Sequence, residues 1–282
     1  MTNTYTTIVK KSILLVICLF PLGSFANQAV KPENMVILLD LSDRLLIPNQ
    51  GSRDTAIIME AWRSFEKKAK ARLIVTCKNR FSIVLAPQEN TAPELLNIQQ
   101  TLSIDLGSIP PAQKLKALQN FSATFPSKIA RIYRLAIRGK QSSDYPGTDI
   151  WRYFDEQLYM DAPAEYQNKL IVLTDGYFDF EHSQDKFHTE FYHTTTNFLK
   201  SLPQIGWSEY AIRTKTGLLP VSRKFPDLQV FVACLHSKTK RQDETAMLAF
   251  FWREWLKTMN VTKTETFPNS IQIDRIVYSF KN

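Results

Sequence analysis

The chain has 282 residues, of which 44% are hydrophobic and 22% charged. This composition excludes a disordered chain, a collagen and a coiled coil, and the length suits one large α/β domain. The formal net charge is +8, and removal of residues 1–26, which hold two lysines and no acidic residue, would leave 8 − 2 = +6. A basic surface of this size favours anionic partners such as acidic proteins, envelope polymers or lipid headgroups.

The first 26 residues have the features of a secretory signal peptide. Lys10 and Lys11 precede the apolar run 12–20, and Ser24 and Ala26 offer small side chains at the two positions that a signal peptidase reads. The run is shorter than the roughly 20 apolar residues that span a bilayer. We expect cleavage after Ala26 and export to the periplasm or out of the cell, with an uncleaved anchor as the alternative. We expect no nucleic-acid partner and no transmembrane segment after signal removal.

Apolar runs alternate with amphipathic segments along the rest of the chain. The run 35–41 is short and almost wholly apolar, which predicts a strand buried on both faces. A helix is predicted over 54–72, with Asp54 as its N-cap. The apolar runs 73–77 and 81–86 are separated by three polar residues and predict a β-hairpin, which would add one antiparallel strand to the sheet.

Residues 87–110 are rich in Pro, Asn, Gln and Thr and are interpreted as a surface excursion with a weak strand at 102–106. The further predicted elements are helices at 111–121, 127–138 and 148–159, a buried strand at 170–174, a helix at 186–202, an excursion at 203–227, a buried strand at 228–235, a helix at 243–259, and a last strand at 271–280 with a bulge near 274–275. This alternation predicts a three-layer α/β sandwich with a doubly wound, mostly parallel central sheet. A single domain over 27–282 is the simplest organisation.

Polar loops follow the first two buried strands, at the edge where such sheets bind ligands, and a third polar loop stands between them in the sequence at a loop-to-helix junction. Asp-Leu-Ser-Asp-Arg stands at 40–44, Gly-Thr-Asp at 147–149 and Thr-Asp-Gly at 174–176. In this order the three loops resemble the metal-ion-dependent adhesion site of the von Willebrand factor A (VWA) family. The resemblance covers the mature chain in the order of its elements and rests on these three loops for its specific motifs.

The resemblance implies that Ser42 and Thr148 bind a metal ion directly, and that Asp40 and Asp175 bind it directly or through water. Hydroxyl and carboxylate oxygens are the donors that Mg²⁺ takes. A site with few direct carboxylates leaves the ion able to accept a carboxylate from a partner. We therefore expect Mg²⁺ or Mn²⁺, a protein partner recognised through an acidic residue, and a binding protein without enzymatic activity.

Arg44 departs from the family pattern Asp-x-Ser-x-Ser, which has a serine at this position. A hydroxyl ligand is lost and a permanent cation is gained. Three consequences are open: the ion binds weakly, with Asp43 or water in the lost position; Arg44 points away; or Arg44 pairs with Asp40 or Asp175 and replaces the metal. Asp43, Arg44 and Asp149 are therefore the residues expected to modulate the site or to contact the partner.

Each motif also has a structural interpretation. Asp40 can bond backbone amides at a strand end, Thr148 can cap its helix, and Asp175-Gly176 is a common turn pair. A metal-free adapter that uses only the scaffold is one alternative. A metal-dependent phosphoester hydrolase resembling the haloacid dehalogenases, with Asp40 as nucleophile, is another; those enzymes usually carry a second Asp where this chain has Ser42.

Two further groups of residues are candidate sites. His182, His188 and His193 are spaced by six and five residues, unlike the three or four of a helical zinc site, which favours a solvated segment. Cys77 and Cys234 are the cysteines left after signal removal. In the strand order that the resemblance implies, two central strands separate them, so we predict two buried free thiols.

Overall fold

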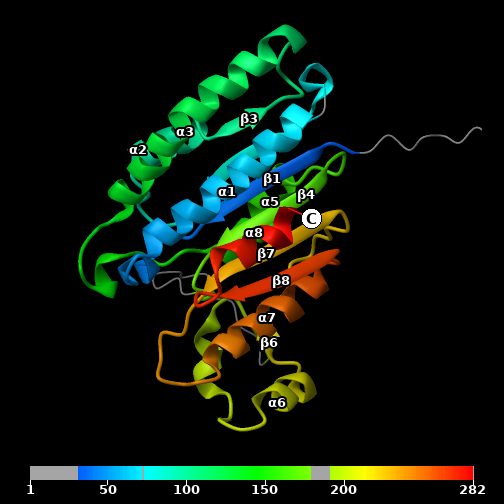
Figure 1. The fold of residues 1–282 in the computed structure, drawn as a ribbon. Helices are drawn as coiled ribbons and strands as arrows, with labels where there is room; N and C mark the ends of the chain where they lie inside the picture. The colour runs from blue at the N-terminus through cyan, green and yellow to red at the C-terminus, as the bar shows by residue number, and fades with distance from the viewer. Residues whose placement is uncertain (1–30, 72, 179–190, 282) are drawn as a thin grey trace, which may run out of the picture. The chain divides into compact units, whose positions relative to one another are not determined.

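Six strands form one sheet in the part of the chain that the computed structural model describes, which is residues 31–71, 73–178 and 191–281 (Figure 1). Along the sheet the order is β3-β2-β1-β4-β7-β8, and all neighbours run parallel except β2 and β3. The strands are β1 (Glu33–Leu39), β2 (Arg80–Leu85), β3 (Ser103–Asp105), β4 (Gln167–Leu173), β7 (Leu228–Leu235) and β8 (Lys263–Pro268). The predicted, mostly parallel sheet with one antiparallel strand is confirmed.

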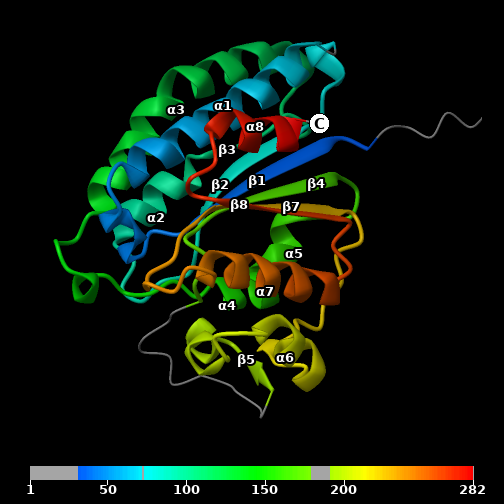
Figure 2. The same ribbon diagram turned by 60° about the horizontal axis from the view of Figure 1, so that its bottom comes forward.

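Helices cover both faces of this sheet, as Figure 2 shows. One face carries α1 (Gln50–Ala71), α2 (Pro93–Gln100), α3 (Lys114–Ala136) and α8 (Ile273–Lys281). The other face carries α4 (Ile150–Arg152), α5 (Leu158–Asp161) and α7 (Glu244–Thr258). Beside α7 lie α6 (Trp207–Thr214) and a small sheet of β5 (Tyr192–His193) and β6 (Gly217–Leu218). The predicted three-layer α/β sandwich is confirmed.

β1 and β4 lie in the middle of the sheet and are buried at every position after the first. Along β1, Ile37 and Leu39 pack on the side of α1 and α3, whereas Val36 and Leu38 pack on the side of α7. Because successive side chains point to opposite faces, a strand that is apolar throughout fills two cores. β1 pairs parallel with β4, so the carboxyl ends of the two strands lie side by side. The polar loops at 40–44 and 174–176 begin at these ends.

The predicted hairpin is wrong. Residues 74–76 form a short 3₁₀ helix, and β2 pairs parallel with β1. The antiparallel partner of β2 is β3, at the predicted weak strand 102–106. Leu73 is 75% exposed, so this run lacks the cover that a buried strand needs. A long helix, α1, connects β1 to β2, and a crossover of this kind joins parallel strands.

The predicted last strand, 271–280, is also wrong. Most of these residues belong to α8, which begins at Ile273, and β8 is the edge strand of the sheet. Ile276, Val277 and Phe280 are buried on one side of α8 while Tyr278 is 71% exposed, a helical spacing that the short apolar alternation concealed. No bulge lies near 274–275; the irregular register is between Ala233 and Leu235 of β7.

The helices α1 and α3 differ from their predicted bounds. α1 begins at Gln50, so Asp54 lies inside the helix and is not its N-cap. The two helices predicted over 111–121 and 127–138 are one helix, α3, which continues through Pro126. A proline inside a helix costs about 3 kcal/mol. The side chains of Phe125 and Ile129 are wholly buried on either side of it, and burial of this apolar face offsets the cost.

The two predicted excursions hold regular elements. α2 and β3 lie within 87–110, and α6 and β6 lie within 203–227. The helix predicted over 186–202 is wrong for its described part, where β5 and a short 3₁₀ helix (Thr196–Ser201) stand, while 186–190 fall outside the described residues. The helix predicted from Thr148 is present as α4 and α5, joined by a π-helical turn at Tyr153–Gln157.

Cys77 and Cys234 are both buried and unpaired. Cys77 precedes β2 and Cys234 lies in β7. As predicted, the two central strands β1 and β4 lie between β2 and β7. The signal-peptide prediction falls on residues outside the described part of the chain. Across the described ranges, none of the helices combines the length and the apolar character needed to cross a membrane.

Lys169 is a buried cation on β4. Its Nζ donates to the carbonyl oxygen of Phe280 at 2.9 Å and lies 3.9 Å from a carboxylate oxygen of Glu33. Burial lowers the pKa of Lys169 from its ordinary 10.5 to about 8, against the opposing effect of Glu33. Between these two pH values the unfolded chain keeps the proton and the folded chain releases it, so the free energy of unfolding rises with pH.

Compared with Lys169→Met, the wild-type protein is expected to gain up to about 3 kcal/mol in free energy of unfolding between pH 8 and pH 10.5. Urea unfolding of both proteins at a series of pH values measures this difference. Taking the difference between the two proteins removes the contributions of all other titrating groups to the pH dependence, because both proteins contain them. A difference that stays constant across the window would contradict the buried-cation account.

Candidate functional site

Asp40 joins the three polar loops at the end of β1. Its Oδ1 accepts hydrogen bonds from the backbone N–H of Ser42 and from the hydroxyl of Thr148, both at 2.9 Å. Its Oδ2 accepts a hydrogen bond from the hydroxyl of Thr174 at 2.8 Å. Asp40 is 1% exposed. One buried carboxylate thus holds together the loops at 40–44, 147–149 and 174–176.

A small pocket with a volume of about 180 Å³ lies at these loops. We call it the loop pocket. Its lining residues are Ser42, Asp43, Ser142, Tyr145, Pro146, Gly147, Thr148, Asp175, Tyr177 and Lys238. Four of the residues singled out in the sequence therefore line one cavity, and Asp40 lies bonded to two of them.

Asp175 is the buried acid of this pocket, with 1% exposure. Its Oδ1 accepts the backbone N–H of Tyr177 at 3.2 Å, while its Oδ2 is buried and accepts no hydrogen bond of good geometry, although the Lys238 ammonium lies 3.3 Å away. Burial raises the pKa of Asp175 to about 7, against the opposing effect of Lys238. Asp175 thus keeps one oxygen whose need for a positive partner is only partly met.

Gly176 allows the loop after β4 to turn between the pocket residues Asp175 and Tyr177. Its φ is +102°, a backbone conformation that favours glycine. A Cβ at this position would lie 2.6 Å from Cδ2 of Leu235, so the Leu235 side chain would have to move. The turn interpretation of Asp175-Gly176 and its place at the pocket are therefore compatible.

Arg44 turns away from the pocket and is fully buried. Its guanidinium donates to the two carboxylate oxygens of Asp54 at 2.7 and 3.0 Å, and to the backbone carbonyl of Asp40 at 3.2 Å. Of the three consequences considered for this residue, the pairing with the carboxylate of Asp40 or Asp175 is not the one observed. Asp54 neutralises the guanidinium below the loops.

Asp149 caps the helix that follows the Gly-Thr-Asp loop. Its Oδ1 accepts the backbone N–H of Arg152 at 2.9 Å. The capping role considered for Thr148 thus belongs to its neighbour, because the Thr148 hydroxyl is directed to Asp40. Asp149 and Arg44 do not line the loop pocket, whereas Asp43 does.

Lys238 was missed by the sequence analysis. It lies on the loop after β7, and its Nζ is 2.8 Å from Oδ1 of Asp43, 3.3 Å from Oδ2 of Asp175 and 4.9 Å from the centre of the Tyr177 ring. The three motifs at 40–44, 147–149 and 174–176 include no residue of the loop after the third buried strand, 228–235. β7 is parallel to β4 and its carboxyl end lies at the same edge, so its loop belonged with the other two.

No family model matches the chain, and no curated protein matches its sequence. In structure the chain is similar to the pilus adhesin SpaC from Lactobacillus rhamnosus GG in its open conformation, with a TM-score of 0.37 and 11% identity over 90% of this chain. A second crystal structure of SpaC gives a TM-score of 0.40 and 12% identity over the same share. This chain spans 30% of the length of the adhesin. Similarity at this level says nothing of what the chain binds.

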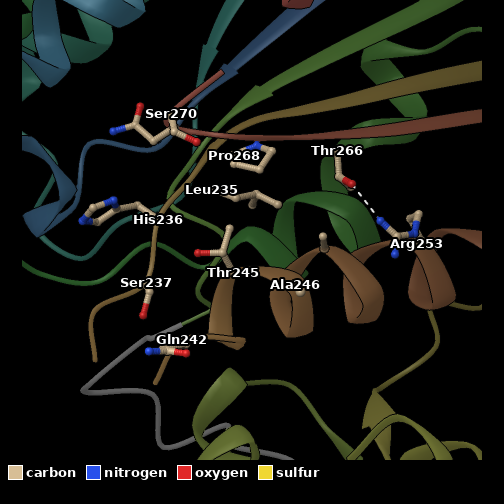
Figure 3. Close-up of a pocket in the computed structure, with 12 residues that line it drawn as sticks. Leu235, His236, Ser237, Gln242, Thr245, Ala246, Arg253, Thr266, Pro268 and Ser270 are labelled. Carbon is tan, nitrogen blue, oxygen red and sulfur yellow. Dashed lines mark hydrogen bonds between the residues drawn. The ribbon is translucent and has the colours of Figure 1, made fainter. Parts of the chain in front are cut away.

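A wider groove of about 670 Å³ lies between the ends of β7 and β8 and the first turns of α7 (Figure 3). His236 and Ser237 line it, and Lys238, the next residue, lines the loop pocket. Arg253 bonds the hydroxyl of Thr266 at 3.0 Å across the groove. One loop thus borders both hollows.

The donors around the loop pocket suit a hard divalent cation. Ser42, Thr148 and Asp175 line the pocket with hydroxyl and carboxylate oxygens, the donors that Mg²⁺ and Mn²⁺ take. Oδ2 of Asp175 accepts no hydrogen bond of good geometry and has the Lys238 ammonium 3.3 Å away. Both carboxylate oxygens of Asp40 already accept hydrogen bonds, so Asp40 supports Ser42 and Thr148 from behind the lining. In the described ranges no three His, Cys, Asp or Glu side chains are grouped as a metal site. An ion at the pocket would therefore depend on the hydroxyl oxygens.

The histidines considered for zinc do not form a described cluster. His182 and His188 lie outside the described residues. His193 belongs to β5 and stacks on the ring of Phe198 with 4.8 Å between ring centres. This contact gives His193 a packing role.

Proposed function

We propose that the chain is an exported, VWA-like binding protein without enzymatic activity, and that it recognises a protein partner through the loop pocket. A divalent cation, Mg²⁺ or Mn²⁺, would join the pocket to a carboxylate of that partner. The observation that carries the proposal is the convergence of oxygen donors from three loops around a pocket in which the buried Oδ2 of Asp175 accepts no hydrogen bond of good geometry and has a cation, the Lys238 ammonium, 3.3 Å away. Export is proposed from the features of residues 1–26.

Each residue of the site has a separate part in this proposal. Ser42 and Thr148 would supply hydroxyl oxygens to the ion, and Asp175 would supply charge. Asp40 positions Thr148 and the backbone of Ser42 through the hydrogen bonds already formed. A bound ion would supply the positive charge that attracts an acidic side chain. Asp43, on the pocket wall, would add to the attraction for the cation.

The adjoining groove offers room for the rest of the partner's contact segment. At about 670 Å³ it is larger than the loop pocket, and it carries the cationic Arg253. The net charge of the chain is positive. Both features favour an acidic segment, whose neighbouring residues would lie along α7 while one carboxylate enters the loop pocket.

Asp40 is poorly placed to act as the nucleophile of a phosphoester hydrolase. Both of its carboxylate oxygens already accept hydrogen bonds, and the residue is 1% exposed. A nucleophile needs an oxygen within reach of the phosphorus. This arrangement favours the binding protein over the enzymatic alternative.

The cation is tested by thermal unfolding in EDTA, Mg²⁺ and Mn²⁺. We expect either ion to raise the midpoint of the wild type, by about 2.7 kcal/mol of added stability at a hundred times its dissociation constant. Asp175→Asn should abolish the ion-dependent rise because the charged donor is lost. Asp274→Asn, which removes an exposed acid on α8, is the matched control and should keep the rise.

Two results would count against the cation. An equal rise in wild type and Asp175→Asn would mean that the ion binds elsewhere. If neither ion shifts the midpoint and isothermal titration at millimolar ion detects no heat of binding, the metal-free adapter becomes the better description, and the pocket would then recognise its partner without an ion.

A further inference from the structure

A cation of the chain itself stands in the loop pocket. The ammonium of Lys238 lies 2.8 Å from Asp43 and 3.3 Å from the oxygen of Asp175 that accepts no hydrogen bond of good geometry. These two carboxylates come from the loops after β1 and β4, and Lys238 comes from the loop after β7. The side chain of Lys238 is 31% exposed, so it lines the pocket and still has access to solvent.

The fold aims this lysine at the pocket. The backbone N–H of Lys238 donates to the hydroxyl of Tyr177 at 2.9 Å, and its ammonium lies over the same ring. On the other side, Glu244 accepts hydrogen bonds from Ser237 and Thr239, the two neighbours of Lys238. The loop is therefore anchored on both sides of the lysine, and its ammonium has a defined place.

The ammonium and a divalent ion would need the same oxygen. Oδ2 of Asp175 is the buried oxygen that would ligate an ion. It is also the carboxylate oxygen that pairs with the Lys238 ammonium. Two positive charges within a few ångströms repel each other strongly at a partly buried site. The ion can bind fully only when Lys238 leaves, which the exposed side of the pocket allows.

We propose that Lys238 is a tethered cation that competes with the divalent ion for Asp175 and Asp43. This inference rests on the proposed function, because it concerns the same ion site. At rest the lysine neutralises the two carboxylates, and the pocket then has low affinity for metal. Binding of the ion requires the lysine to swing out toward solvent. The site therefore fills at a higher free ion concentration than it would if the same oxygen ligands had no competing lysine.

The test compares Mn²⁺ binding to the wild type, Lys238→Met and Lys240→Met by isothermal titration and by the electron paramagnetic resonance signal of free Mn²⁺. Lys238→Met is expected to bind Mn²⁺ at least about tenfold more tightly than the wild type, since the competing charge and its ion pairs are removed. Lys240→Met removes the same charge two residues away, outside the loop pocket, and is expected to match the wild type. Lys238→Arg, which keeps a cation, should stay weak.

The outcomes separate this inference from the proposed function. Equal Mn²⁺ affinity in the wild type and Lys238→Met would overturn the competition while leaving the ion site in place. The same tightening in Lys238→Met and Lys240→Met would also overturn it, because general charge would then be the cause. If none of the proteins binds Mn²⁺, the ion site itself is refuted and the competition with it. Lys238→Gln serves as a second uncharged variant, and circular dichroism checks that each variant is folded.

Discussion

Replacing Asp54 by asparagine is expected to lower the free energy of unfolding by about 3–5 kcal/mol, because the guanidinium of Arg44 would remain buried without a counterion. Both side chains of this pair are fully buried. Asp54 also accepts hydrogen bonds from Gln50 at 2.7 Å and from the hydroxyl of Tyr133 at 3.0 Å. A neutral amide can replace neither the charge nor all of these acceptor contacts.

Urea unfolding measures this loss. The control is Lys70→Met in the same helix, which breaks the exposed pair with Glu66 and should cost less than about 1 kcal/mol. The double variant Arg44→Met with Asp54→Leu should recover much of the loss, since it removes both buried charges together. An Asp54→Asn protein as stable as the Lys70→Met control would contradict the role assigned to the pair.

Truncating Trp252 to alanine is expected to cost about 3–5 kcal/mol, because it opens a cavity in the core beneath the loop after β4. Trp252 is 1% exposed, and its ring centre lies 4.8 Å from that of Phe178 and 5.7 Å from that of Trp255. Its indole N–H donates to the carbonyl of Gly176 at 3.0 Å. Trp252 therefore supports the residue next to Asp175.

The matched variant Trp252→Phe keeps most of the ring volume and loses the hydrogen bond to Gly176, at an expected cost of about 1–3 kcal/mol. Chemical unfolding of both variants gives the two costs. If Trp252→Phe destabilises as much as Trp252→Ala, the hydrogen bond outweighs the packing. If Trp252→Ala costs less than about 1 kcal/mol, the core beneath the loop is not packed as described.

The central strands could be predicted because their sequences allow one interpretation. The runs that became β1, β4 and β7 are apolar at nearly every position, which is typical of strands buried on both faces. Parallel strands end at one edge, so the meeting of the loops at 40–44 and 174–176 followed from the strand order, whereas the place of the loop at 147–149 beside them was implied by the resemblance to the VWA family. The ion expected there stays a prediction.

Short or polar segments could not be assigned in the same way. The run 73–77 and the segment 271–280 are too short for their periodicity to separate helix from strand. Burial in the tertiary structure decided the conformation of both segments. Leu73 is mostly exposed, whereas Phe280 packs into the core beside Phe231. β8 is only partly buried along its length, since it stands at the edge of the sheet, and its sequence carries no strong apolar signal.

The sequence by itself determined which polar residues follow the buried strands, because composition along a strand reflects its burial. Only the tertiary structure decided which charges meet. Arg44 pairs with Asp54 inside α1, and Lys238 reaches Asp43 across 195 residues of chain. Such pairs depend on strand order and on the path of each loop, since charge attraction acts over distance in space and leaves no fixed spacing in the sequence.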